Sequence, residues 1–207
     1  MIELTNIYKT YDKKVIFEDY HLKINTNEFI GVVGKSGQGK TTLLNILGLI
    51  DKPNDGTVYF FGKAVRSERL RRLLLRNNIG FIFQNYALID NMTVNDNLDI
   101  ALKHKKLKRK VRETERKIAL DQVDLRGYGD KKIHTLSGGE QQRVAIARLL
   151  IKDPSIILAD EPTGSLDKEN RDLIVSIFQD LHRKGKTIIM VTHDEHLIQF
   201  FSRTLYL

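Results

Sequence analysis

One segment of the chain has the residue pattern of a phosphate-binding loop. Residues 34–41 match G-x-x-x-x-G-K-[ST] at every fixed position, between an apolar run at 28–33 and a helical pattern that follows. Glycines let backbone N–H groups converge on phosphate oxygens, and the helix adds the positive end of its dipole. The lysine reaches the β- and γ-phosphates and the threonine reaches Mg²⁺. The expected nucleotide-binding residues here are Gly34, Ser36, Gly37, Gly39, Lys40, Thr41 and Thr42.

A second apolar run, at 155–159, ends in two carboxylates. Asp160 is placed to hold Mg²⁺ through a water, and Glu161 to polarise a water for attack on the γ-phosphate. Pro162 predicts an extended conformation for Glu161, with the two carboxylates on opposite sides of the backbone. An acidic turn that only ends a strand is the alternative. The phosphate loop upstream favours the catalytic interpretation.

A third segment, LSGGEQQR at 136–143, opens a helical pattern. Ser137 suits the N-cap position and Glu140 completes a capping box, so a well-capped helix is one interpretation. Two glycines weaken a helix start unless another group must approach the backbone, and the N–H groups there suit a second anion. A phosphate loop and a distant anion site predict ATP held between two places. The residues of this second site are Ser137, Gly138, Gly139 and Glu140.

Together and in this order, the three motifs make the chain similar to the ATP-binding cassette (ABC) family over nearly its whole length. Residues 136–143 resemble the signature sequence of that family. The resemblance implies an ATPase with ATP and Mg²⁺ as cofactors, acting as a head-to-tail dimer. ATP then lies between the phosphate loop of one subunit and Ser137–Gly139 of the other, and hydrolysis opens the pair. None of the motif residues that the family requires is replaced in this chain, which implies two active sites in a homodimer.

The resemblance also implies roles for residues whose type and position alone do not indicate a function. Tyr11 matches the aromatic residue that stacks on adenine, with Tyr8 as the competing candidate. Gln84 matches the glutamine that contacts Mg²⁺ and senses the transport partner, and His193 matches the histidine that contacts the γ-phosphate. The loop that crosses the dimer interface is implied to contain Ser165 and Asp167. The implied catalytic residues are Glu161, His193 and Gln84, and the implied metal ligands are Thr41, Gln84 and Asp160.

Buried strands that alternate with helices must position these motifs. The apolar runs at 28–33, 155–159 and 187–191 are typical of a parallel sheet, and helices are expected at 43–50 and near 168–184. This alternation predicts an α/β fold with a mostly parallel core sheet. The resemblance makes it a P-loop NTPase of the ABC type, with a small antiparallel β-subdomain and an inserted helical subdomain. Further strands are predicted at 57–61 and 79–83.

We expect a single domain over 1–207. Its catalytic core comprises about 1–88 and 152–207 and includes the β-subdomain, while about 89–151 form the helical subdomain that carries the signature. The chain has no cysteine, so disulfides, thiolate nucleophiles and zinc–thiolate sites are excluded. No apolar run approaches the ~20 residues of a membrane helix, and the start lacks the features of a signal peptide. We therefore expect a cytoplasmic protein, peripheral on the inner face of the plasma membrane.

The partner expected from the resemblance is a separate integral-membrane permease. We expect no regulatory domain after Leu207, and 131–135 differ from the segment typical of fused multidrug exporters. Residues 49–53 and 83–94 are similar to the macrolide-exporter and lipoprotein-release branch, which implies export or extraction of peptide, lipoprotein or antimicrobial cargo. A non-transport ABC ATPase, division-linked or of the Fe–S assembly type, is the alternative. Intact Glu161 and His193 disfavour a non-hydrolysing nucleotide sensor.

Two features of the surface can each be interpreted in two ways. Apolar side chains after Gln84 suit either a permease docking surface or ordinary subdomain core; they are Tyr86, Leu88, Ile89 and Met92. The net charge of +8 includes a basic run at 103–110, which suits an anionic membrane leaflet or a solvated helix. Because the motifs assign ATP as the anion, we expect no nucleic-acid partner.

Overall fold

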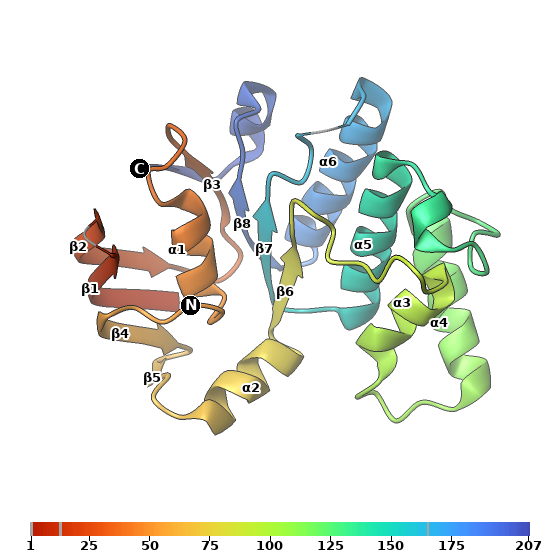
Figure 1. Cartoon of the computed structure of the whole chain (residues 1–207), viewed down its shortest axis with the longest axis horizontal. Helices are drawn as coiled ribbons and strands as arrows, with labels where there is room; N and C mark the ends of the chain where they lie inside the picture. The colour runs from red at the N-terminus through yellow and green to blue at the C-terminus, as the bar shows by residue number, and fades with distance from the viewer. Residues whose placement is uncertain (1, 13, 165) are drawn as a thin grey trace.

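The computed structural model describes residues 2–12, 14–164 and 166–207 and is centred on a parallel sheet (Figure 1). The strand order is β6-β7-β8-β3-β9, and every neighbouring pair is parallel. Its strands are β3 (Phe29–Val33), β6 (Ile79–Ile82), β7 (Ile156–Asp160), β8 (Thr187–Val191) and β9 (Arg203–Tyr206). Strand β7 shows why the sheet is buried on both faces. Ile156 and Leu158 enter one apolar cluster, and Ile157 and Ala159 enter the other.

The second sheet is antiparallel and lies beside helix α1 (Lys40–Leu47). Its strand order is β2-β1-β4-β5. The strands are β1 (Ile2–Tyr11), β2 (Lys14–Ile24), β4 (Asp55–Phe60) and β5 (Lys63–Ala64). Apolar side chains of this sheet, of α1 and of one face of the parallel sheet share a single cluster. The expected α/β class, with a parallel core sheet and a small antiparallel sheet, is confirmed.

The opposite face of the parallel sheet is covered by α5 (Gly138–Lys152) and α6 (Lys168–Arg183). Helices α3 (Val94–Leu102) and α4 (Arg109–Gln122) pack against α5, and all four helices contribute to the other apolar cluster. Two short 3₁₀ segments are η1 (Ile133–Thr135) and η2 (Glu195–Phe200). Helices occupy most of the stretch assigned to a helical subdomain. The boundaries of that subdomain remain a prediction.

Helix α2 (Glu68–Asn77) was not anticipated from the sequence. Half of its ten residues are charged and only Leu74 is buried, so the segment lacks the long apolar run that marks a core helix. Ser67 does carry a start signal, because its side chain accepts a hydrogen bond from the Leu70 N–H at 3.2 Å.

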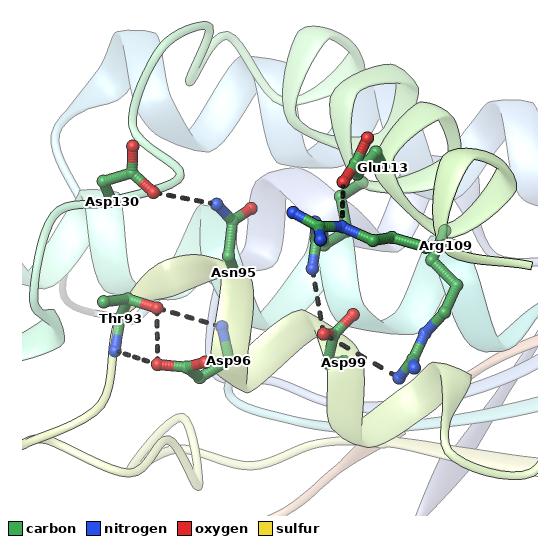
Figure 2. Close-up of polar contacts among 9 residues, drawn as sticks. Thr93, Asn95, Asp96, Asp99, Arg109, Glu113 and Asp130 are labelled. Atoms are coloured by element: carbon green, nitrogen blue, oxygen red, sulfur yellow. Dashed lines mark hydrogen bonds and ion pairs between the residues drawn. The ribbon is translucent and has the colours of Figure 1, made fainter.

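Local polar contacts fix α3 and α4 relative to each other (Figure 2). The N-cap Thr93 and Asp96 form a capping box at the start of α3. Further along α3, the Asp99 carboxylate accepts from Arg116 at 2.9 Å and lies 3.8 Å from Arg112, both on α4.

Across the three described stretches, no helix combines the length and apolar character needed to cross a membrane.

Candidate functional site

The loops after four parallel strands meet at one edge of the core sheet, as expected where carboxyl ends of parallel strands converge. The phosphate loop follows β3, Gln84 follows β6, Glu161 follows β7 and His193 follows β8. They enclose a cavity of about 560 Å³. Its lining residues are Ile16, Ser36, Gly37, Gly39, Lys40, Thr41, Thr42, Gln84, Asp160, Glu161, Gly164, Val191 and His193.

The phosphate loop presents an uncapped helix start to this cavity. Gly39 is the N-cap of α1 with φ +96°, it offers no side chain to the helix N–H groups, and no acidic residue follows in the first turn. A Cβ at Gly39 would come within 2.6 Å of Ile16, so this position requires glycine for space as well as for its dihedral angle. The open N–H groups and the helix dipole together suit an anion.

Lys40 is buried at the base of the cavity, with 6% of its surface exposed. Its ammonium donates to the carbonyl oxygens of Gly34 at 2.8 Å and Lys35 at 2.9 Å. These neutral carbonyls satisfy the hydrogen bonds of the ammonium without neutralising its charge. The loop therefore keeps a net positive centre at the place where the phosphates are expected.

Two half-buried carboxyls, those of Asp160 and Glu161, also line the cavity. Burial raises the pKa of Asp160, while the Thr41 hydroxyl and the Lys40 charge act in the opposite direction. Burial likewise raises the pKa of Glu161, opposed first by His193. The His193 N–H donates to Glu161 Oε2 at 3.3 Å, and His193 Nε2 lies 3.1 Å from Glu161 Oε1. The two expected catalytic side chains are thus in direct contact.

The extended conformation predicted for Glu161 is wrong. Glu161 has φ +48°, in the left-handed region, and its N–H donates to the Val191 carbonyl at 3.0 Å. Pro162 disfavours a right-handed helix at the preceding residue, but it does not impose an extended strand there. The left-handed residue follows the last residue of β7, and its carboxylate contacts His193.

The residues expected to hold Mg²⁺ fit that ion. Thr41, Gln84 and Asp160 line the same cavity, and Thr41 is close enough to Asp160 to lower its pKa. All three offer oxygen donors, and Mg²⁺ in nucleotide sites takes only a few protein oxygens besides those of the phosphates. Consistently, within the described residues no group of three or more His, Cys, Asp or Glu side chains forms a cage for a metal ion alone.

Two expected nucleotide-binding residues lie outside the cavity lining. Gly34 lies below it, and its carbonyl receives the Lys40 ammonium. Tyr11, at the end of β1, bonds to Asp51 through its hydroxyl, and Thr42 is near enough to influence its pKa. Tyr11 is 45% exposed. These contacts favour Tyr11 over Tyr8 as the aromatic residue beside the phosphate-binding helix.

The signature segment lies apart from the cavity, at the start of α5. Ser137 caps the helix by accepting from the Glu140 N–H at 3.3 Å, and Glu140 accepts from the Ser137 N–H at 2.7 Å. A Cβ at Gly138 would come within 3.2 Å of the Tyr86 hydroxyl, and one at Gly139 within 3.4 Å of Asn170. None of the four signature residues is among the described residues that line the cavity.

The expected dimer loop lies next to the signature helix. Asp167 is the N-cap of α6, where its carboxylate accepts from the Asn170 N–H at 2.8 Å. Asn170 and Leu166 are the nearest neighbours of the Gly139 position. The other predicted residue of this loop, Ser165, lies outside the described residues.

Strand β2 contributes two residues that were missed by the sequence reasoning. Ile16 lines the cavity, and the Lys14 ammonium donates to the Gly37 carbonyl at 3.2 Å. Nothing in the local sequence distinguishes these residues from others in an exposed strand. Their position depends on how the antiparallel sheet packs against the phosphate loop.

Known proteins resemble the chain over almost its entire length. The family model described as ABC transporter matches residues 17–164. An uncharacterised ABC transporter ATP-binding protein of Methanocaldococcus jannaschii is 42% identical over 100% of this chain and 95% of its own length. A macrolide export ATP-binding/permease protein of Chlorobaculum tepidum is also 42% identical, over 99% of this chain but only 32% of that longer protein.

Solved structures agree with this relationship. A bacterial ABC transporter cassette with a dimeric structure superposes with a TM-score of 0.93 at 37% identity, covering 100% of this chain and 94% of that one. A dimeric post-hydrolysis state bound to ADP and Pi gives a TM-score of 0.93 at 35% identity, with the same coverage. The chain therefore belongs to the ABC transporter family, and it is an ATPase whose ATP hydrolysis is coupled to transport.

Proposed function

We propose that two copies of this chain stack head to tail and hold ATP between them. The observation that carries this proposal is the separation of the two anion sites. One cavity collects the phosphate loop, both carboxyls and His193, while the exposed start of α5 with Ser137 lies outside it. A similar cassette has a dimeric structure. In the dimer, Ser137 and Gly138 of one subunit complete the γ-phosphate site of the other.

Within each site, Glu161 orients and polarises the attacking water, and His193 contacts the γ-phosphate. Their mutual contact at 3.1 Å supports this pairing, because the histidine fixes the carboxylate that must face the water. Lys40 and the N–H groups of the phosphate loop stabilise the phosphate charges. Mg²⁺, bound by Thr41, Gln84 and Asp160, supplies further charge neutralisation to the phosphates.

We propose that the chain powers a permease carried on a separate polypeptide. The macrolide export relative combines ATP-binding and permease functions in its name, and this chain spans about a third of that protein. The part of the chain that the structure describes contains no membrane-spanning helix. A permease for peptide, lipoprotein or antimicrobial export fits the similarity to the macrolide branch.

A groove of about 780 Å³ at the opposite end of α5 from the signature suits a permease segment. It lies between α2 and α3, beside the end of α5 (Figure 1). Apolar side chains include Phe81 and Phe83, whose rings stack at 5.1 Å. The basic lining residues are Arg72, Arg76, His104, Lys105, Arg148 and Lys152. Among the described lining residues none is acidic, and none of these cations forms an ion pair with a described residue.

The charge of this groove defines the chemistry of the permease segment. Burial lowers the pKa of Lys152, and the neighbouring Arg148 charge lowers it further. An incoming carboxylate would relieve this repulsion, so we propose an amphipathic segment with apolar and acidic side chains. Of the apolar residues after Gln84, Ile89 and Met92 are more than 40% exposed and are therefore accessible to a partner. Leu88 and Tyr86 pack partly against the core.

Isolation of the protein from detergent-solubilised native membranes tests this function. We expect an integral-membrane protein to co-purify, and recovery of the chain without one would count against transport through a separate permease. Arg76→Glu is expected to abolish co-purification, because it opposes an acidic partner. Arg183→Glu is the matched control at an exposed arginine of α6, and it is expected to retain the partner.

We also propose that the protein works on the inner face of the plasma membrane. Its basic run, 103–110, is mostly exposed, and the only ion pair that the described residues show there joins Arg109 and Glu113 (Figure 2). Clusters of this size are attracted to anionic leaflets at about 1 kcal/mol per basic residue. Neutralising the run is expected to reduce recruitment to permease-containing anionic vesicles. Unchanged recruitment would assign the run to a solvated surface.

A further inference from the structure

Three side chains at the end of β1 form a closed network beside the phosphate-binding helix. Lys9 Nζ lies 2.8 Å from each Asp51 carboxylate oxygen and donates to the Lys52 carbonyl at 2.8 Å. The Tyr11 hydroxyl donates to Asp51 Oδ2. Lys9 Nζ also lies 4.7 Å from the centre of the Tyr11 ring. Tyr11 is thus held both at its hydroxyl and at one face of its ring.

The Lys9 ammonium of this network is buried, so its charge must be neutralised within the network. Lys9 is 6% exposed, whereas Tyr11 is 45% exposed. A buried ammonium needs a counter-charge, and Asp51 provides it while accepting the tyrosine hydroxyl. The cation also attracts the electron-rich face of the ring. One side of Tyr11 is therefore fixed against the protein, and its remaining surface is open for stacking.

The network is attached to α1, the helix that begins at the phosphate loop. The Asp51 N–H donates to the carbonyl of Asn45, a residue of α1, at 3.2 Å. Asn54, three residues further on, accepts from the Thr10 N–H at 2.9 Å. The loop after α1 therefore fixes the end of β1, and with it Tyr11, relative to the phosphate-binding end of the same helix.

We propose that Asp51, together with Lys9, is a positioning residue that fixes the Tyr11 ring as the platform for the base of ATP. This inference rests on the proposed role of Tyr11 in stacking. Stacking depends on the orientation of the aromatic ring. A ring that rotates freely must be immobilised when the nucleotide binds, which weakens binding of the base without weakening binding of the phosphates.

The experiment compares ATP with inorganic tripolyphosphate, which has phosphates but no base. Asp51→Asn is expected to weaken ATP binding about three- to tenfold and to leave tripolyphosphate binding unchanged. Tyr11→Phe removes the hydrogen bond of the tyrosine but leaves the Lys9–Asp51 ion pair intact, so it should weaken ATP binding by no more than Asp51→Asn does. Because both variants release the same ring, the double variant should bind ATP no more weakly than Asp51→Asn alone. Titration calorimetry on the full chain measures both affinities.

The controls separate positioning from a role in folding alone. Glu68→Gln breaks the exposed ion pair with Lys52 at 3.0 Å and is expected to leave both affinities unchanged. Equal losses for ATP and tripolyphosphate in Asp51→Asn and Tyr11→Phe would overturn the inference, since the network would then support only the fold. Unchanged ATP affinity in both variants would overturn it too. If Tyr11→Ala also binds ATP normally, the proposed stacking role of Tyr11 itself fails.

Discussion

The starts of α1 and α5 are both glycine-containing helix N-termini, yet they are built differently. At α1, Gly39 offers no side-chain cap, and Lys40 leaves a positive centre beside the open N–H groups. At α5, Ser137 and Glu140 cap the helix reciprocally. The first terminus opens into a cavity within its own chain, and the second faces outward.

The difference shows how one chain makes two kinds of phosphate site. The α1 terminus leaves its donors open for an anion that the same chain encloses. The α5 terminus satisfies the N–H groups of Ser137 and Glu140 with its own side chains, which stabilises the helix without ligand. The Ser137 hydroxyl accepts the bond from the Glu140 N–H, so its own O–H remains available to donate to an incoming phosphate. This suits a site that is needed only when a second subunit brings ATP.

The largest effect is expected at Glu161, which acts on ATP after the starts of α1 and α5 have both bound it. Glu161→Gln removes the base that polarises the attacking water, so ATP hydrolysis is expected to fall about 10²- to 10⁴-fold. ATP should remain bound and the dimer should accumulate, as measured by size-exclusion chromatography with ATP. Unchanged turnover would remove Glu161 from this role.

The next effect tests the α1 terminus. Lys40→Ala removes the buried ammonium, and the lost charge-assisted bonds should weaken ATP binding about ten- to a hundredfold. Titration with a fluorescent ATP analogue measures this. Lys35→Ala, at an exposed lysine of the same loop, is the control and should bind normally. Full affinity in Lys40→Ala would contradict the phosphate-loop assignment.

The α5 terminus should give a smaller effect of another kind. Ser137→Ala is expected to leave ATP binding to the single chain intact while lowering hydrolysis about tenfold, because the hydroxyl reaches only the partner's nucleotide. Loss of the cap, worth about 1 kcal/mol, should lower the melting temperature by about 2–4 °C.

Ser67→Ala provides a matched control for the cap itself. Ser67 caps α2 through the Leu70 N–H at 3.2 Å, far from either phosphate site in the sequence. It should lower the melting temperature to a similar extent and leave hydrolysis unchanged. If Ser137→Ala and Ser67→Ala affect hydrolysis equally, the signature serine has only a structural role.

The sequence predicts features that are set by neighbouring residues better than features that are set by contacts between distant segments. The phosphate loop and the two buried strands β7 and β8 follow from local periodicity and glycine spacing, and they were located to within one or two residues. The left-handed conformation of Glu161 could not be predicted, because Pro162 disfavours only a right-handed helix at the preceding residue and leaves more than one other conformation open. Ile16 was missed because its place in the cavity depends on packing between two sheets.

Complementation between two defective variants tests the central claim most directly. Lys40→Ala disables the phosphate loop, and Gly138→Asp places a negative charge at the signature site. Each variant alone should be inactive. In a head-to-tail dimer, a mixed pair contains one intact site, so an equal mixture should recover about a quarter of the wild-type ATPase activity. A mixture no more active than its separate components would contradict ATP binding between the phosphate loop of one subunit and the signature of the other.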